Sequence, residues 1–367
     1  MSKISVNVKA PISFKNGGEF FYGANTHDGF REYYSDFINI NECDRIFNII
    51  GGPGTGKSTL MKKIAEECLN VGCECEKYFC SSDTASLDAI RIYSPESEKV
   101  IAICDATAPH ERAFDTPGAV TSIIDLSRFW DITDLESNKN AILDLQDKKK
   151  ESYLKAYTYI KLLATANRAI EKEISSYICR DKLIALCEEL THSLKGENSN
   201  RNIFLRPTTA LSMKGEHTLT DEYWKAERST VIQDVLGTST VLIKALFKRL
   251  ETQNVTVFAS PSCEVCGGYT QLYIPESKLL ISTVPSEKKE IVSTKEIISK
   301  CIPKSSRVLI ESLQKTAKKA KTAALHELSL ARDHHFALEK IYGRCMDFDS
   351  KDKFDTEIVN NISHYIK

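Results

Sequence analysis

The chain has no uninterrupted apolar run of the ~18 residues that a transmembrane helix needs. Its first residues, MSKISVNVKAPISF, lack the apolar core of a signal peptide. Neither sign of charge dominates, because the formal net charge is −1, and no overall field favours nucleic acid or an anionic membrane. Twelve cysteines without a secretion signal indicate buried thiols in a reducing compartment. We therefore expect a cytoplasmic protein with neither a membrane nor a nucleic acid as partner.

The composition that is present suits a packed protein. Apolar residues make up 42% of the 367 residues and charged residues 27%, so a hydrophobic core is feasible. A chain of this length favours about two domains at ~150 residues each.

Internal similarity indicates that the two domains arose by duplication. The segment at 313–340 follows the segment at 145–172 by 168 positions without a gap, and eight of these 28 positions are identical. PES at 95–97 recurs 180 positions later, and GKST at 56–59 is echoed by GTST at 237–240. The order of the echoes is the same in both halves, and the second half lacks the equivalent of residues 107–118. We predict a first repeat at 1–195 and a second at 196–367.

Each repeat reads as a sheet followed by long helices. RIFNII at 45–50, CECEKYFC at 73–80 and KVIAIC at 99–104 are typical of buried strands, while Leu60, Ile64 and Cys68 recur at helical spacing between the first two. Strands that alternate with a helix predict an α/β fold with a parallel sheet flanked by helices. Residues 140–195 and 306–345 are charged and helically periodic, so each sheet is expected to precede a long helical segment.

A glycine-rich stretch joins the first strand to the first helix. GGPGTGKS, from Gly51 to Ser58, fits the P-loop pattern G-x-x-x-x-G-K-[ST] in the context that supports such a match. The glycines let successive backbone N–H groups point into one concavity, and the helix presents its positive end there. The sequence thus predicts a P-loop NTPase fold that binds ATP with Mg²⁺. The expected nucleotide-binding residues are Gly51, Gly52, Pro53, Gly54, Thr55, Gly56, Lys57, Ser58 and Thr59.

Other side chains complete the expected site. Lys57 would meet the β- and γ-phosphates, and Ser58 would ligate Mg²⁺. Asp105, at the end of an apolar strand, is the predicted second metal residue, with Asp83 as the competing one. For activating water, His110, Asp83 and Glu111 stay open as candidates, because Asp105 is followed by Ala106 rather than by an acid. A positive finger for the γ-phosphate could come from Arg45, Arg112 or Arg168.

The second repeat is expected to be degenerate. Aligning Gly237 with Gly56 places Thr238 at the position of Lys57, and IQDVL at 232–236 at the position of GGPGT. Asp234 would repel phosphate, and LLIST at 279–283 offers no counterpart of Asp105. One nucleotide per chain follows. Cys263 and Cys266 form a lone C-x-x-C, which falls short of the four ligands of a structural zinc site.

The sequence also resembles a family, the uncharacterised ATP-binding proteins of spore-forming bacteria that carry tandem P-loop NTPase domains. The residues that carry the resemblance are FYGANTHDGF at 21–30, GGPGTGKSTLMKK at 51–63, CSSDTASLD at 80–88, DATAPH at 105–110 and PGAV at 117–120. It implies a P-loop fold in both halves and no particular substrate. The chain departs from the family in its second half, which is less like a P-loop.

Three activities fit these features. The first is slow ATP hydrolysis that switches the arrangement of the two halves. The second is a small-molecule kinase whose acceptor would bind near 23–29 or 107–118, and the third is a nucleotide-dependent scaffold without catalysis. No LSGGQ-like motif of ABC transporters and no N-K-x-D motif of Ras-type GTPases occurs, so ATP is the expected nucleotide.

Overall fold

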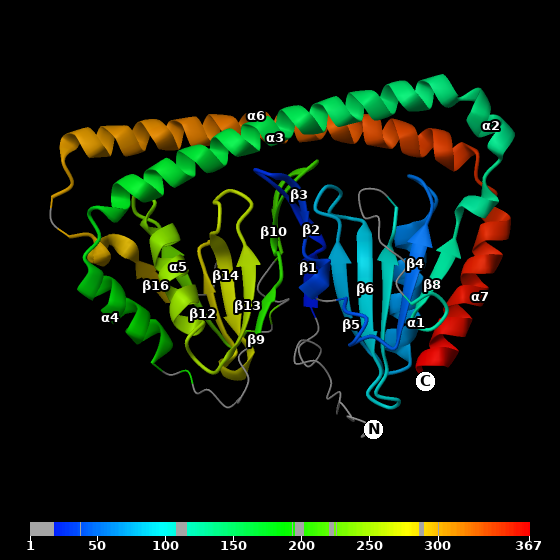
Figure 1. Ribbon diagram of the computed structural model, residues 1–367, viewed down its shortest axis with the longest axis horizontal. Coiled ribbons are helices and arrows are strands. Elements are labelled where there is room, and N and C mark those ends of the chain that lie inside the picture. The colour runs from blue at the N-terminus through cyan, green and yellow to red at the C-terminus, as the bar shows by residue number, and fades with distance from the viewer. Residues whose placement is uncertain are drawn as a thin grey trace. The chain divides into compact units, whose positions relative to one another are not determined.

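In the computed structural model of the protein, the chain forms two compact units (Figure 1). The described residues are 18–36, 38–107, 116–192, 194, 202–219, 224, 226–285, 290–299 and 301–367. Unit 1 comprises Met1–Tyr22, Tyr34–Ser152 and Leu330–Lys367, and unit 2 comprises Gly23–Tyr33 and Tyr153–Ser329. This partition by contacts differs from the consecutive repeats 1–195 and 196–367, which stay an interpretation of the sequence.

Unit 1 is built on a six-stranded sheet in the order β1-β5-β6-β7-β4-β8. Its strands are β1 (Gly18–Phe21), β4 (Arg45–Ile50), β5 (Glu74–Phe79), β6 (Leu87–Tyr93), β7 (Val100–Asp105) and β8 (Thr121–Asp125). The strands expected at 45–50, 73–80 and 99–104 are thus confirmed. β4 lies between β7 and β8 and is parallel to both, so these three strands end at the same edge of the sheet.

The sheet is mixed, which corrects the expected all-parallel sheet. β6 was missed in the sequence and runs antiparallel to both β5 and β7. The connections on either side of it, at 80–86 and 94–99, are too short for the crossover that parallel neighbours require. The chain therefore reverses at both ends of β6.

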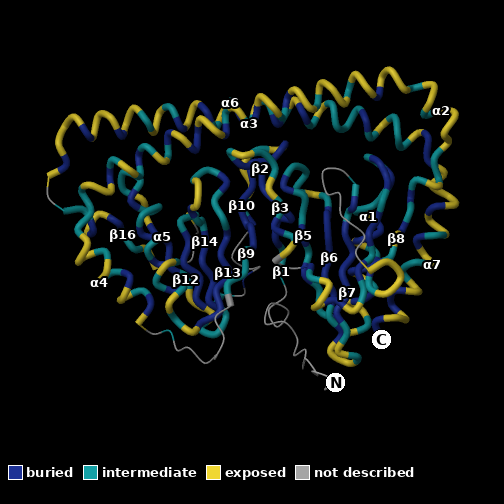
Figure 2. The backbone as a smooth tube through the Cα atoms, in the orientation of Figure 1, coloured by how far each residue is buried: buried dark blue, intermediate teal, exposed yellow. Residues whose placement is uncertain are grey.

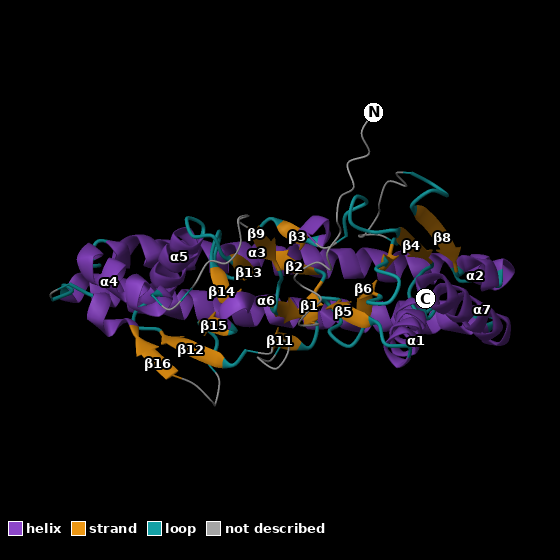
Figure 3. Cartoon of the chain, turned by 90° about the horizontal axis from the view of Figure 1, so that it is seen from below, coloured by secondary structure: helices purple, strands orange, loops and turns teal. Residues whose placement is uncertain are grey.

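Two helices that are far apart in the sequence build the core of unit 1. Helix α1 (Lys57–Asn70) buries Leu60, Ile64 and Cys68, as their spacing predicts. Beside it lies α7 (Phe348–Ile366), the last helix of the chain, which contributes Ile362 and Ile366 to the same apolar cluster (Figures 1 and 3). The strands of the sheet are largely buried (Figure 2). The short helix α2 (Ile132–Ser137) follows β8 after a 3-10 turn.

Unit 2 repeats this strand arrangement. Its sheet has the order β16-β12-β15-β14-β13-β9, which matches β8-β4-β7-β6-β5-β1 of unit 1 strand for strand. The directions match as well, because β12 is parallel to β15 and β16 while β14 is antiparallel to its two neighbours. The strands are β9 (Asn202–Leu205), β12 (Arg228–Gln233), β13 (Thr256–Pro261), β14 (Tyr269–Ile274), β15 (Leu279–Ser282) and β16 (Glu290–Ser293).

The core of unit 2 is also formed by two distant helices. Helix α5 (Thr238–Leu250) buries one apolar face in it, and α4 (Arg180–Thr191) packs beside α5 with Cys187 in the same cluster. Two hairpins complete the unit. They are β2 (Gly23–Thr26) with β3 (Gly29–Glu32), and β10 (Thr209–Ser212) with β11 (Gly215–Thr218). The amide of Asn25 donates to the carbonyl of Leu211 over 2.9 Å and joins them.

The long helices expected from the charge pattern are α3 (Lys139–Ser175) and α6 (Lys304–Arg344). Each is continuous and contributes residues to both units. None of the helices in the described parts of the chain is long and apolar enough to cross a membrane.

All twelve cysteines lie in the described ranges, and no disulfide joins them. Seven are buried. Burial raises the pKa of Cys68 and of Cys75 to about 12, so these thiols stay protonated at neutral pH.

Candidate functional site

The glycine-rich loop lies at the carboxyl edge of the unit 1 sheet. β4 ends at Ile50, α1 begins at Lys57, and Gly51–Gly56 connect them. Gly54 (φ 71°) and Gly56 (φ 85°) adopt left-handed backbone conformations that other residues rarely adopt. The sequence needs glycine at these two positions for the turn from strand to helix.

Lys57 and Asp105 meet at this loop, as the sequence predicts. Asp105 ends β7 and pairs with Ile49 of the parallel neighbour β4, which carries it to the same edge. The Lys57 ammonium (Nζ) lies 3.5 Å from Asp105 Oδ2, and both side chains are 13% exposed. It also donates to the carbonyl oxygens of Gly51 (2.7 Å) and Gly52 (2.9 Å). Lys57 is thus folded back over the loop, with its charge balanced by one carboxylate.

Thr107 fastens the end of β7 to the loop. Its hydroxyl donates to the carbonyl of Gly51 over 2.8 Å, and its backbone N–H donates to Asp105 Oδ1 over 2.8 Å. Asp105 therefore has one oxygen held by the backbone and the other beside Lys57.

The turn that contains Asp83 is held against the start of α1. The hydroxyl of Ser58 accepts a hydrogen bond from the backbone N–H of Leu87 over 2.9 Å, and Lys62 Nζ donates to the carbonyl of Ala85. Within the turn, Asp83 Oδ2 accepts from the Ser86 hydroxyl over 2.8 Å. The turn is therefore anchored to the helix that follows the loop.

The other expected residues have different outcomes. His110 lies in 108–115, outside the described residues, as do Glu111 and Arg112. Arg45 begins β4, at the end of the strand away from the loop, where it donates to the carbonyls of Gly118 and Ala119. Its position removes it as a finger for this loop. Arg168 belongs to α3 within unit 2.

The positive end of α1 has no side-chain cap. In the described part of the chain, no side-chain oxygen accepts a hydrogen bond from the N–H groups of Gly56–Thr59, and the first turn contains no acid. A helix leaves its first N–H groups without intrahelical acceptors, so this end suits an anion.

The segment that follows Leu330 covers the loop, which the motif did not predict. A Cβ placed on Gly54 would lie 2.8 Å from the carbonyl oxygen of Glu339, and one on Gly52 would lie 3.0 Å from the Trp130 ring and 3.3 Å from Tyr342. The rings of Trp130 and Tyr342 are 5.4 Å apart. The last turns of α6 thus pack directly on the loop.

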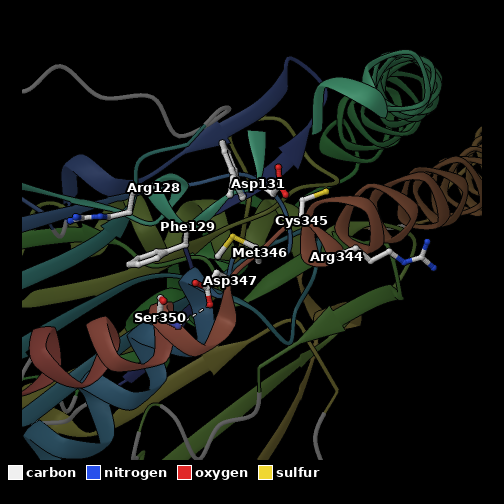
Figure 4. Close-up of a pocket in the computed structure, with 9 residues that line it drawn as sticks. Arg128, Phe129, Asp131, Arg344, Cys345, Met346, Asp347 and Ser350 are labelled. Carbon is white, nitrogen blue, oxygen red and sulfur yellow. Dashed lines mark hydrogen bonds between the residues drawn. The ribbon is translucent and has the colours of Figure 1, made fainter. Parts of the chain in front are cut away.

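A cavity of about 690 Å³ is lined by residues of the segments 128–131 and 344–350 (Figure 4). Arg128 and Arg344 extend away from each other in Figure 4, and Asp347 accepts a hydrogen bond from the backbone N–H of Ser350 over 3.0 Å. The charged groups on its wall do not converge on one point. Its lining residues are Arg128, Phe129, Trp130, Asp131, Arg344, Cys345, Met346, Asp347 and Ser350.

The corresponding loop of unit 2 is built differently. Gly237 precedes α5 in the left-handed conformation (φ 89°), like Gly56 before α1. However, β12 continues through Gln233, so Ile232 and Gln233 belong to the strand and only Asp234–Gly237 form the loop. The expected match of IQDVL to GGPGT is therefore wrong in detail, because the strand's pairing with β16 extends to Gln233.

Asp234 occupies the helix end in unit 2. One carboxylate oxygen accepts from the N–H of Gly237 over 2.9 Å, and the other accepts from the N–H of Ser239 over 2.8 Å. The hydroxyl of Thr238, at the position aligned with Lys57, bonds to Thr294 and to the carbonyl of Val235. The anion position at α5 is thus filled by the chain itself.

The described ranges contain no cluster of three or more His, Cys, Asp or Glu side chains that could hold a metal ion. Ser58 and Asp105 supply oxygen atoms, and Mg²⁺ in nucleotide sites takes its remaining ligands from phosphates and water. Their assignment as metal residues stays a prediction. Cys263 is buried and Cys266 is exposed.

Comparisons of the chain with protein-family models, curated proteins and solved structures found no match.

Proposed function

We propose that this chain is a P-loop NTPase that binds ATP with Mg²⁺ at Gly51–Thr59 and hydrolyses it slowly. One observation carries the proposal. Lys57 and Asp105 lie 3.5 Å apart at the glycine-rich loop that precedes α1, a helix end without a side-chain cap. Paired cation, carboxylate and free helix end are the groups that a nucleotide phosphate with its metal requires.

The roles of the residues follow from their chemistry. The backbone N–H groups of the loop and the first turn of α1 would hold the phosphates, and Lys57 would leave the carbonyls of Gly51 and Gly52 to reach them. Ser58 and Asp105 would hold Mg²⁺, which supplies charge neutralisation at the phosphates. Asp83 or His110 would position the attacking water.

Binding of a single nucleotide per chain belongs to the proposal. The Asp234 carboxylate lies where a phosphate would have to bind in unit 2, and it would repel an anion there. The matching strand order of the two sheets supports a tandem duplication of repeats 1–195 and 196–367, with a degenerate second copy.

Slow hydrolysis is proposed because Ala106, not an acid, follows Asp105. The consequence of hydrolysis would pass to α6, because Glu339 and Tyr342 of that helix pack on the loop. Since α6 contributes residues to both units, a change at the loop could switch their arrangement.

Titration calorimetry with a non-hydrolysable ATP analogue tests the binding. We expect about one site per chain in the wild type and none in Lys57→Ala, whereas the control Lys244→Ala should bind normally because Lys244 pairs with Glu171 in unit 2. ATP at ~100 times its dissociation constant should add ~2.7 kcal/mol of stability to the wild type and little to Lys57→Ala. Two sites per chain, or full-strength binding by Lys57→Ala, would contradict the proposal.

Product analysis tests the reaction. Phosphate released to water at well below ~10 s⁻¹, the enzyme median, is expected. Phosphate transfer to an acceptor would identify a kinase instead, and intact ATP after long incubation would identify a scaffold. His110→Ala should lower hydrolysis more than binding.

A further inference from the structure

A buried ion pair lies next to the glycine-rich loop, on the last helix of the chain. Lys351 Nζ donates to Asp355 Oδ2 over 2.7 Å, and the two side chains are 2% and 0% exposed. Lys63 of α1 also lies 3.1 Å from the same Asp355 oxygen. Asp355 therefore has two cations, and its other oxygen, Oδ1, is buried and accepts no hydrogen bond from any described residue.

Lys351 reaches the last residue of the loop. A Cβ built on Gly56 would lie 2.7 Å from Lys351 Nζ and 3.0 Å from its Cε. The ammonium thus lies against the residue at which the loop becomes α1. The Lys351 ammonium has three N–H groups, and one of them donates to Asp355.

Unit 2 contains the equivalent helix with apolar residues in these places. Two backbone hydrogen bonds fix the register between the helices. The N–H of Asp347 donates to the carbonyl of Phe129, and the N–H of Cys179 donates to the carbonyl of Ile297. Cys179 lies 168 positions before Asp347, and Ile297 lies 168 positions after Phe129. The same relation links the bridge Trp130–Met346 to the bridge Ile178–Ile298.

In this register α7 corresponds to α4, since their first residues, Phe348 and Arg180, are also 168 positions apart. Lys351 then corresponds to Leu183 and Asp355 to Cys187, which pack in the apolar core of unit 2. Of these two described helices, α7, beside the loop that has Lys57, carries the charged pair and α4 does not.

This difference indicates that the pair serves a ligand. Burying two charges costs desolvation energy, and replacing a buried ion pair with apolar residues is often neutral or stabilising. Unit 2 packs the same helix without the pair, so the fold does not require it.

We propose that Lys351 is a second cation of the phosphate site, supplied by α7 to the terminal phosphates of the bound nucleotide. The inference rests on the proposed function and adds a residue to it. When Lys351 turns to the phosphates, Lys63 stays with Asp355 and prevents an isolated buried charge. Nucleotide binding would thereby be coupled to the position of the C-terminal helix.

The test replaces the pair by its counterparts from unit 2, in the double variant Lys351→Leu with Asp355→Cys. Without nucleotide, its denaturation midpoint should equal or exceed that of the wild type. Its dissociation constant for the ATP analogue should rise by ~10-fold or more, as expected for the loss of a charge-assisted hydrogen bond. The loss of affinity should be largest for ATP and smaller for ADP and AMP, because Lys351 would contact the terminal phosphates. A purely structural role of Lys351 would weaken the binding of all three nucleotides equally.

Two further variants act as controls. Lys353→Leu removes an exposed lysine of the same helix and should leave the affinity unchanged. Lys351→Arg keeps the charge, so its dissociation constant should stay within ~3-fold of the wild-type value. This is a small difference in binding free energy.

The outcomes separate the two proposals. A wild-type chain that binds no nucleotide overturns both. A wild type that binds, with a folded double variant that binds equally well, overturns the role of Lys351 and leaves the proposed function intact. If the double variant does not fold, the counterparts from unit 2 cannot replace the pair, and the inference is overturned as well.

Discussion

The Asp234 carboxylate accepts a hydrogen bond from the backbone N–H of Gly237, the residue that precedes α5, over 2.9 Å. At the matching position before α1, no described side chain caps the helix. The two sheets share their strand order, yet one helix end is closed by its own chain and the other has no cap from a described side chain.

Removing this internal cap should destabilise unit 2. Asp234→Ala loses hydrogen bonds to two backbone N–H groups, and we expect a cost of ~1 kcal/mol, as for other N-terminal caps. Asp234→Asn, whose single amide oxygen can still accept one of these two bonds, should cost less. Denaturant unfolding measures both, and calorimetry of Asp234→Ala should still give one nucleotide site, because Lys57 has no counterpart in unit 2.

Substitution of Gly54 should cost more than substitution of Gly72. Both have positive φ, and an L-residue in that region costs about 1–2 kcal/mol. A Cβ on Gly54 would also lie 2.8 Å from the carbonyl oxygen of Glu339, whereas a Cβ on Gly72 has open space. Thermal unfolding of Gly54→Ala and Gly72→Ala compares them, and equal losses would show that α6 does not press on the loop.

The last helix should be part of the core of unit 1. Ile362 is 2% exposed and packs with residues of α1 and the sheet, so Ile362→Ala should cost about 2–5 kcal/mol. Val308→Ala, at a position that is 56% exposed, should change stability little. Chemical denaturation distinguishes them. A loss below that of Val308→Ala would mean that α7 is not docked.

Asp352 should make a small contribution that depends on pH. Its hydrogen bond with Lys63 lowers its pKa below the ordinary value of 3.8. A carboxyl group with a lowered pKa stabilises the folded state above that ordinary value, and this contribution disappears as the pH falls through the folded-state pKa.

The variant Asp352→Asn should therefore be slightly less stable than the wild type at pH 7, and the difference should shrink as the pH falls below 3.8 and disappear once it is below the folded-state pKa. The side chain is 61% exposed, so water screening keeps the effect small. Stability measured across this pH range checks the trend, with the exposed Glu357→Gln on the same helix as control. A difference that grows in acid would contradict it.

The sequence by itself determined the local features. Gly54 and Gly56 allow the turn from strand to helix. The spacing of Leu60, Ile64 and Cys68 determines which face of α1 is buried. Asp105 could be placed beside Lys57 because parallel neighbouring strands end at one edge. In each case the deciding interaction lies within a few residues or follows from one strand pairing.

Tertiary structure decided the rest. The antiparallel direction of β6 depends on its two neighbours, and the extent of β12 depends on its pairing with β16. Lys351 reaches Gly56 only because α7, the last helix of the chain, docks beside α1. An apolar helical pattern predicts that one face of a helix will be buried, but not which surface will cover it. The hydrophobic effect depends on the apolar area that is buried and does not select a particular partner surface. The sequence could therefore predict the loop and its helix, while folding selected the helix that brings a second lysine to them.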